Sequence, residues 1–381
     1  MNAMKVFSIK FLLPVLMLLL SYSCKWHRPD NADAIFQPDT VFRVRHAKLF
    51  KIGSVEGHRA AIVLDPWDST RVWARYIIVT HNENYQAPEG YIAVSQPIRS
   101  VATSSSTLFS HLQGLGCLNL LAGVTDTAYV VNPLVKLRIR KGLVTEIGVG
   151  NQIFDEQLIA TDPDVAFFSL FPGLNFDKFN KVGIEVLPLA DYLESTPLGR
   201  AEWIKFSGLI LGKEKETDSI FNEIESNYLK IKSIAQKAKT RPRIVDGLME
   251  GGTWYVSAAQ SYMACLYSDA GLDYVFNDKN GTGSIPLGFE EVLNRAREAE
   301  YWRILKGGPG LSNRNELLQL DSRYRLLNVF HNGKILFCNV SKVPVYEEGN
   351  TRPDLLLADL LYLTHPELNP EYQPVYYQLL P

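Results

Sequence analysis

The side chains of this sequence that could take part in chemistry are hydroxyl, aromatic and guanidinium groups that follow apolar, strand-like segments. Aromatic rings can cover the flat face of a macrocycle or the organic shell of a chelate, and an arginine can meet a carboxylate. The alternative for each aromatic residue is packing between domains, and for the arginine it is a surface ion pair. The candidates are Ser104 and Ser105 in the turn Thr103-Ser104-Ser105-Ser106, Phe171, Trp254, Tyr255, Tyr262, Tyr346 and Arg352.

Signatures of catalysis are missing from the sequence. It contains no GxSxG, no Walker loop, no HExxH and no GxGxxG after a strand. The glycine-rich stretch at 307–310 contains a proline and lacks a following Lys-Ser/Thr, so we interpret it as a plain loop. The seven histidines are scattered rather than clustered with carboxylates, which argues against a protein metal site. We therefore predict neither an enzyme nor a resident cofactor or metal.

Composition sets broad limits on the partners. The chain has 381 residues, 46% of them hydrophobic and 21% charged, with a formal net charge of −2. This is enough chain for two cores, and the charge balance offers no basic field for a phosphate backbone. We expect no nucleic-acid partner, and we expect a monomer.

The N-terminus has the pattern of an export signal. Lys5 and Lys10 precede a short apolar run over 11–20, which is too short for a comfortable membrane span. The run ends in Leu-Ser-Tyr-Ser-Cys24, which resembles the lipobox of bacterial lipoproteins. We expect residues 1–24 to be a signal peptide and an acylated Cys24 to anchor the protein on the periplasmic side of a membrane. The alternative is a plain cleaved signal with an incidental thiol.

The remaining cysteines do not indicate a redox or metal function. Cys117, Cys265 and Cys338 are odd in number and show no CxxC spacing. At most one disulfide could form among them, and we favour buried free thiols.

Periodicity divides the rest of the chain into four segments. Alternating apolar residues predict a β-rich extension over 25–96. Repeated strand and helix patterns predict one α/β lobe over 97–193 and another over 241–381, each with a parallel sheet. The pattern of residues 194–240 predicts two helices. Thr196 caps the first helix, and Gly212 separates it from the second. The second, from about Glu214 to Lys239, is a stiff bridge between the lobes.

The order of these patterns resembles the periplasmic substrate-binding proteins of iron-chelate, haem and vitamin B12 ABC importers. Their two Rossmann-like lobes are bridged by one long helix. The resemblance runs from about Ile98 to the C-terminus and leaves the extension uncovered. It is carried by the opening strand, turn and helix of 98–126, by Phe154–Asp164, where Thr161 replaces the usual leucine, and by Thr196-Pro197-Leu198-Gly199-Arg200.

The resemblance implies a function and partners. The protein would capture a metal chelate between its lobes, a ferric siderophore first, with cobalamin and haem also open, and deliver it to an ABC importer. Glu156 and Glu290 occupy the positions at which this family docks onto arginines of the membrane subunits, with Asp155 and Glu291 as alternatives. Rival hypotheses are a binder of a free metal ion on the same fold and a surface lipoprotein that scavenges without a transporter.

Overall fold

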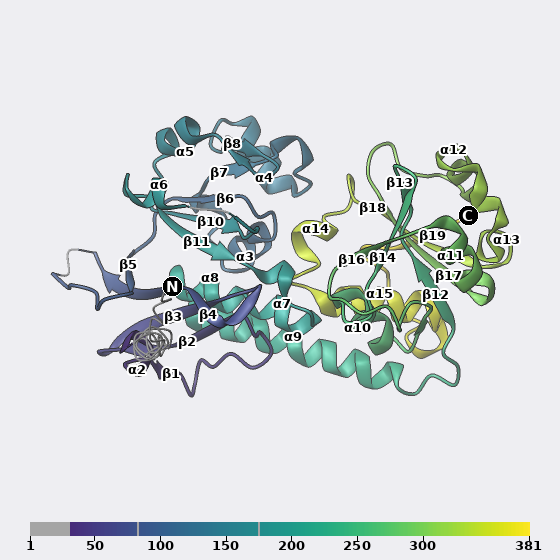
Figure 1. Ribbon diagram of the computed structural model, residues 1–381, viewed down its shortest axis with the longest axis horizontal. Helices are drawn as coiled ribbons and strands as arrows, with labels where there is room; N and C mark the ends of the chain where they lie inside the picture. The colour runs from purple at the N-terminus through teal and green to yellow at the C-terminus, as the bar shows by residue number, and fades with distance from the viewer. Residues whose placement is uncertain (1–30, 82–83, 174–175) are drawn as a thin grey trace, which may run out of the picture.

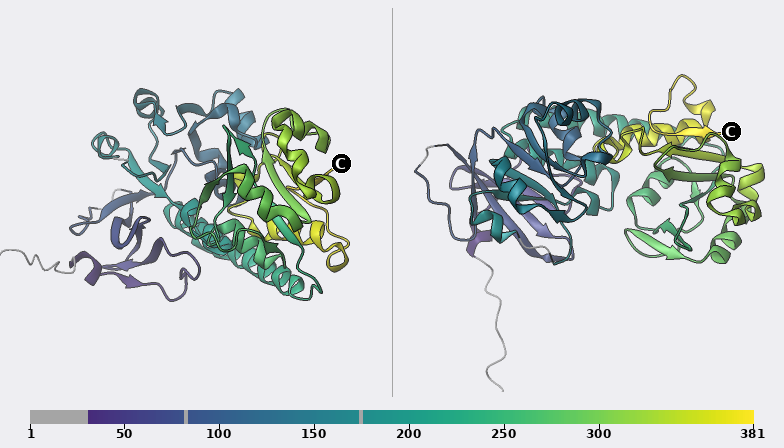
Figure 2. Two further views of the ribbon diagram at one scale, coloured as in Figure 1. Left: turned by 45° about the vertical axis from the view of Figure 1, so that its right-hand side comes forward. Right: turned by 90° about the horizontal axis from the view of Figure 1, so that it is seen from above.

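The computed structural model describes residues 31–81, 84–173 and 176–381, which form an N-terminal sheet and two α/β lobes (Figure 1). The expected signal segment and Cys24 lie outside these residues. In the described part of the chain, no helix combines the length and the hydrophobicity that a membrane span requires. Seen from above, the two lobes lie side by side and are joined by helices at one edge (Figure 2).

The N-terminal segment folds into a five-stranded sheet with the order β1-β2-β3-β4-β5. Glu56 and Gly57 both have positive φ angles, 50° and 86°, which allows the tight turn that joins β2 to β3. The sheet packs on the helices that follow the first lobe through Phe50 and Tyr76, whose rings contact Trp203 and Phe206, respectively. The hydroxyl of Tyr76 also donates to the carbonyl of Val186 in the first lobe at 3.1 Å. A short helix, α2 (Asn31–Ala34), precedes the strands β1 (Gln37–Pro38), β2 (Phe50–Val55), β3 (His58–Asp65), β4 (Asp68–Thr80) and β5 (Ile92–Gln96).

The first lobe is built on a six-stranded sheet with the order β11-β10-β6-β7-β8-β9, parallel except for β9. Helix α4 and strand β8 fall in a stretch to which the sequence patterns assigned no element, because charges interrupt its apolar periodicity. The strands are β6 (Val101–Thr103), β7 (Leu121–Thr125), β8 (Thr145–Val149), β9 (Gln152–Ile153), β10 (Val165–Ser169) and β11 (Glu185–Leu189), and the helices are α3 (Leu108–Gly114), α4 (Pro133–Arg140), α5 (Asp155–Thr161) and α6 (Asp177–Asn180).

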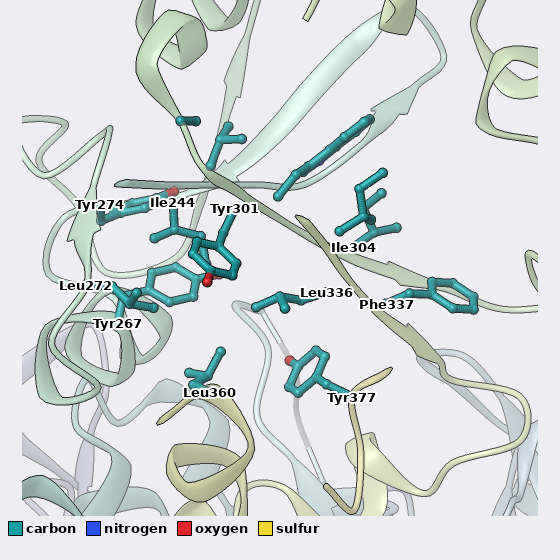
Figure 3. Packing of buried hydrophobic residues seen from close by; sticks show 14 of the residues in the cluster. Ile244, Tyr267, Leu272, Tyr274, Tyr301, Ile304, Leu336, Phe337, Leu360 and Tyr377 are labelled. Carbon is teal, nitrogen blue, oxygen red and sulfur yellow. The ribbon is translucent and has the colours of Figure 1, made fainter. Parts of the chain in front are cut away.

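The second lobe has a sheet with the order β15-β12-β17-β18-β19, in which only β19 is antiparallel. Ile244, Leu336 and Leu360 are among the residues that fill its core (Figure 3). Its strands are β12 (Arg243–Asp246), β15 (Asp273–Tyr274), β17 (Tyr301–Lys306), β18 (Lys334–Asn339) and β19 (Gln378–Leu380). Its helices are α10 (Tyr262–Asp269), α11 (Phe289–Arg295), α12 (Leu317–Leu320), α13 (Asn328–Asn332), α14 (Val345–Glu348) and α15 (Pro353–Thr364). The prediction of two mixed α/β lobes with mainly parallel sheets is confirmed.

A second, antiparallel sheet in this lobe was not predicted. It has the order β13-β14-β16, from β13 (Met249–Glu250), β14 (Thr253–Ser257) and β16 (Ser284–Leu287). Gly251 and Gly252, with φ angles of 57° and 87°, form the turn between its first two strands. The first strand is too short to show an alternating pattern.

Three helices join the lobes: α7 (Pro197–Glu202), α8 (Ile204–Ile210) and α9 (Glu214–Ala235). As predicted, Thr196 caps the first of them, its hydroxyl accepting the N–H of Gly199 at 3.2 Å. The predicted single helix before Gly212 is instead the pair α7 and α8. The bridge α9 ends at Ala235 rather than Lys239, because i→i−3 bonds such as Lys237 N–H to Ile234 O tighten its last turn.

Helix α9 supplies side chains to two separate cores. Phe221 and Ile224 belong to the core of the first lobe, whereas Tyr228 belongs to the core of the second. The hydroxyl of Tyr228 donates to Asp269 in α10 at 2.6 Å. The helix is therefore fixed on both sides of the junction, as Figure 1 shows along the lower edge of the molecule.

Two buried carboxylates tie the N-terminal segment to the junction. Glu202, whose side chain is fully buried, accepts the backbone N–H groups of Arg45, His46 and Ala47 at 2.6–3.0 Å. Glu194 accepts those of the next two residues, 48 and 49, at 2.8 and 2.9 Å. The extension is thus held at the root of the bridge as well as on the lobe.

The turn from α8 into α9 brings two backbones close together. A Cβ atom added to Gly208 would lie 1.9 Å from the hydroxyl oxygen of Thr217, in the first turn of α9. Because that distance is far below van der Waals contact, no side chain fits at position 208 without moving one helix. We refer to this contact as the α8–α9 elbow.

His111 should make the stability of the first lobe sensitive to acid. It is fully buried on α3, with Nδ1 2.9 Å from the hydroxyl of Ser207, and burial lowers its pKa from 6.5 to about 3. The unfolded chain therefore binds a proton below pH 6.5 that the folded chain does not, so stability falls as pH drops below 6.5. Between pH 7 and pH 5 this should remove about 2 kcal/mol.

His111→Phe should abolish that share of the acid sensitivity. Urea titrations of both proteins at several pH values would measure it. If the unfolding free energies of the two proteins stayed parallel from pH 7 to pH 5, this role of His111 would be excluded.

Candidate functional site

A cleft of about 600 Å³ lies between the two lobes. Its walls come from the turn after β6, the ends of β10 and β17, helix α7, and the loops around α10 and α14. Among the described residues that line it there is no Asp, Glu, His or Cys. The residues that give it its chemistry are Ser104, Ser105, Ser106, Ser169, Phe171, Tyr192, Arg200, Ser257, Tyr262, Arg303, Tyr346, Asn350 and Tyr377. We call this space the arginine chamber.

Arg200 reaches the arginine chamber from α7, beside the bridging helix. Its Nε donates to the carbonyl of Glu194 at 2.9 Å, and its Nη1 donates to the side-chain oxygen of Asn350 at 3.1 Å. The guanidinium lies over the ring of Tyr262, 4.1 Å from the centroid. These contacts hold a cation in place while using only two of its five N–H donors.

Arg303 enters the chamber from the opposite lobe, at the middle of β17. Its Nε donates to the hydroxyl of Tyr377 at 2.6 Å, and its Nη1 lies 3.9 Å from a carboxylate oxygen of Asp246. That carboxylate is itself fixed, because the hydroxyls of Tyr267 and Tyr274 donate to it at 2.9 and 2.6 Å. The guanidinium is therefore preorganised before any ligand arrives.

The tyrosines of the chamber are neutral hydrogen-bonding groups. Burial raises the pKa of Tyr192 and that of Tyr262 to about 12, with the charge of Asp191 adding to the first shift and that of Arg200 opposing the second. Burial also raises the pKa of Tyr346. Each phenol has one O–H group, and those of Tyr192 and Tyr262 are donated to the backbone carbonyls of Leu170 and Gly349. The two arginines therefore supply the positive charge of the chamber, and its protonated phenols are poor ligands for a metal ion.

A second space lies beside the first and shares the serine turn with it. It has a volume of about 330 Å³ and shares Ser104, Ser105, Ser106 and Tyr346 with the arginine chamber. Its other walls come from both lobes and contain the apolar residues Phe109, Val130, Val131, Val340, Val343 and Pro344 together with Thr103, Thr125, Asp126, Tyr129 and Glu347. We call it the valine chamber.

One segment of the second lobe crosses to the first and closes this side of the cleft. Glu347, on α14, accepts the backbone N–H groups of Val131 and Asn132 at 2.6 and 2.7 Å. Asn350 donates its side-chain N–H to a carboxylate oxygen of Asp191 at 2.8 Å. Burial raises the pKa of Glu347, opposed by the two N–H bonds. The lobes are thus in direct contact at the rim of both chambers.

Five of the eight ligand-binding residues predicted from the sequence meet at this cleft. Ser104, Ser105, Phe171, Tyr262 and Tyr346 all line the arginine chamber. The hydroxyl of Ser104 accepts the N–H of Ser169 at 3.0 Å, which fixes the turn against β10. The arrangement follows from the topology, since parallel strands of both lobes end at the same gap.

The other three predicted residues lie elsewhere. Trp254 is fully buried in the second lobe, 5.6 Å from the ring of Trp302, because β14 turns it inward. Tyr255 alternates to the outside of the same strand and does not line the chambers. Arg352 forms a two-point ion pair with Asp354 at 2.8 and 2.9 Å, which is the alternative considered for it. The structure thus does not bring these three residues to the cleft.

The two arginines were missed by the sequence analysis. Arg200 ends the segment Thr196–Arg200, which had been interpreted only as a family signature. Arg303 interrupts the apolar strand Tyr301–Leu305, and a lone charge in an otherwise buried strand is a signal of a functional or paired group. A search for the partner of each arginine that lies in an apolar segment could have found both residues.

Metal-binding clusters are absent from the described residues. No three His, Cys, Asp or Glu side chains of residues 31–81, 84–173 and 176–381 are grouped so that they could hold an ion. Cys117, Cys265 and Cys338 are free thiols, and two of them are buried. The cleft consequently offers charge, hydroxyls and aromatic surface, with no ligand set for a bare cation.

Comparison with known proteins identifies the family. The sequence pattern of the family described as periplasmic binding protein matches residues 101–339. The chain belongs to this family. Its members bind ligands and are not enzymes, in agreement with the chemistry of the cleft. The matched range runs from β6 to β18 and includes both arginines.

Relatives and solved structures agree with this assignment. An uncharacterized lipoprotein of Methanocaldococcus jannaschii is 29% identical over 238 residues, which cover 60% of this chain and 54% of that protein. The chain thus spans about half the length of that relative. A second uncharacterized lipoprotein of the same organism is 22% identical over 338 residues, which are 85% of this chain and 83% of that protein.

Two solved structures show the same fold. A periplasmic haem-binding protein from Pseudomonas aeruginosa has a TM-score of 0.58 at 16% identity, covering 74% of this chain and 98% of that one. A structure described as an ABC-type Fe³⁺-hydroxamate transport system, from Saccharomonospora viridis, has a TM-score of 0.54 at 18% identity, covering 70% and 93%.

The two glutamates expected to dock lie on different lobes. Glu156 is exposed in the first turn of α5, and Glu290 is exposed in the first turn of α11. Their neighbours are already paired: Asp155 with Lys178 at 2.7 Å, and Glu291 with Lys279 at 2.5 Å. Neither Glu156 nor Glu290 has an ion-pair partner within the part of the chain that the structure describes.

Trp254→Phe should weaken folding without changing ligand affinity. The substitution removes the bond from the indole N–H to the carbonyl of Asp246, 2.9 Å long, and leaves a cavity beside Trp302. We expect a loss of about 2 kcal/mol in unfolding free energy by urea titration. Tyr255→Phe is the matched control on the same strand and should be nearly neutral. If ligand affinity fell in Trp254→Phe but not in Tyr255→Phe, Trp254 would belong to the ligand site.

Proposed function

We propose that this protein captures a ferric siderophore between its lobes and delivers it to an ABC importer while anchored to the periplasmic side of a membrane through Cys24. The observation that carries the proposal is the arginine chamber. It places Arg200 and Arg303 on opposite walls, and no carboxylate, histidine or thiol stands among its described lining residues. Such a lining suits an anionic metal chelate rather than a free cation.

The neutral tyrosines bear on the kind of cargo. Since burial keeps Tyr192 and Tyr262 protonated and their hydroxyls donate to backbone carbonyls, these two residues offer no phenolate ligand to a metal. This favours a cargo whose metal is already fully coordinated by its organic shell. Haem and cobalamin are second candidates, because the aromatic walls would also cover a macrocycle. A free metal ion is disfavoured by the lack of a ligand cluster in the described residues.

The docking step rests on Glu156 and Glu290. Both carboxylates are exposed at helix N-termini, where arginines of a membrane subunit could form two-point bonds with them. The ion pairs of Asp155 and Glu291 with lysines make these neighbours less suitable. A scavenger without a transporter would need no such pair of carboxylates.

Calorimetric titration of the soluble protein lacking residues 1–24 tests the cargo. A ferric siderophore with net negative charge should bind saturably, and Arg200→Met with Arg303→Met should weaken it at least about tenfold. Arg352→Met, an arginine outside the cleft, should have little effect, with folding checked by circular dichroism. Tight binding of free zinc, with no binding of siderophores, haem or cobalamin, would refute the proposal.

Uptake assays test the docking. Glu156→Ala combined with Glu290→Ala should abolish accumulation of iron from the labelled chelate in cells that have no other copy of the protein, and should leave calorimetric affinity unchanged. Asp155→Ala combined with Glu291→Ala is the matched control and should retain most uptake. Normal uptake in the first pair would favour the scavenger, and loss of affinity would place those glutamates in the cleft.

A further inference from the structure

The two chambers of the cleft are neighbours but differ in chemistry. They share the turn Ser104–Ser106 and Tyr346 as walls, so one ligand that reaches past these residues could occupy both. The arginine chamber presents both guanidinium groups and most of the hydroxyls. The valine chamber has no described cation in its walls and is closed on one side by Val130 and Val131 and on the other by Val340 and Val343.

The two carboxylates of the valine chamber already have partners within the protein. Both carboxylate oxygens of Glu347 are bound to backbone N–H groups of the first lobe, at 2.6 and 2.7 Å. Both oxygens of Asp126 accept the N–H of Gly150 at 3.0 Å. The hydroxyl of Thr103 donates to the carbonyl of Phe167 at 2.8 Å. The charged groups of this chamber are therefore occupied by the protein itself.

The size of the valine chamber is that of a ligand subsite rather than a packing defect. Its volume of about 330 Å³ falls within the range of about 300–1,000 Å³ typical of ligand pockets. Protein interiors are normally filled to the density of organic crystals, so an apolar space of this size beside a binding cleft is unusual. Water beside the four valines would meet methyl groups, and an apolar group that displaced it there would be stabilised.

We infer that the ligand is bipartite: an anionic chelate head occupies the arginine chamber, and an aliphatic acyl arm of the same molecule occupies the valine chamber. The inference rests on the proposed function, because the head is the ferric siderophore assigned to the cleft. Tyr346, which lines both chambers, marks the point where head and arm join. The arm would lie between valines of both lobes and would therefore favour their closed arrangement.

Two ferric complexes of one citrate-based dihydroxamate, one acetylated and one octanoylated on the hydroxamate nitrogens, provide the test. Each would be titrated calorimetrically into the protein lacking residues 1–24. The octanoyl complex should bind at least about tenfold more tightly, because several methylene groups leave water. Its binding should also show the more negative heat-capacity change that accompanies apolar burial.

Val340→Thr combined with Val343→Thr isolates the contribution of the chamber. Threonine is close to valine in shape but adds a hydroxyl, so the variant should lose most of the octanoyl advantage while binding the acetyl complex as before. Val182→Thr, at an exposed position away from the cleft, is the matched control and should keep the full advantage.

The possible outcomes separate the two proposals. Equal affinities for the two complexes, or an octanoyl advantage that survives in the double threonine variant, would overturn the bipartite ligand and leave the siderophore proposal intact. Binding of neither complex would refute the siderophore itself, and the inference with it.

Discussion

Two buried carboxylates at the root of the bridging helix determine how the parts of this molecule are arranged. Glu202 and Glu194 together accept five consecutive backbone N–H groups of residues 45–49. A buried carboxylate is stable only when such donors surround it, and removing one side of the arrangement leaves unsatisfied groups at a cost of about 3–5 kcal/mol. The same short stretch of chain presents Arg200 to the cleft. The N-terminal sheet, the first lobe and the ligand site are therefore coupled through one junction.

In the second lobe, a buried carboxylate likewise fixes the position of an arginine. Asp246 is buried at the end of β12, and its carboxylate accepts hydrogen bonds from the hydroxyls of Tyr267, Tyr274 and Ser257. One of its oxygens lies 3.9 Å from Nη1 of Arg303. A cation that is held by a fixed carboxylate and by Tyr377 loses little freedom when an anion binds. Each lobe thus brings one preorganised guanidinium to the shared chamber, and the cleft acquires its charge preference only when both lobes are in place.

Much of the architecture could be predicted from the sequence, because it depends on local periodicity. The strand-helix alternation of each lobe, the stripe of Phe221, Ile224 and Tyr228, and the cap at Thr196 are all encoded within a few residues of one another. The serine turn at 104–106 could be placed in the site because it directly follows a strand. The predictions that were not met depend on tertiary structure: Trp254 was placed after the first strand of the second lobe as a ligand-binding residue, and the short strands that bury it leave no pattern. Arg200 and Arg303 could be seen as charges, but their convergence depends on how the lobes meet.

The α8–α9 elbow has a mechanical consequence. Helix α9 has 22 residues, and at 1.5 Å per residue it is a lever of about 33 Å. A change of about 5° at its base would displace the far end by about 3 Å, roughly the length of one hydrogen bond. Because Gly208 meets Thr217 with no room for even a methyl group, any side chain at position 208 would have to push the two helices apart. Such a shift would change the spacing of the two arginines, which belong to different lobes.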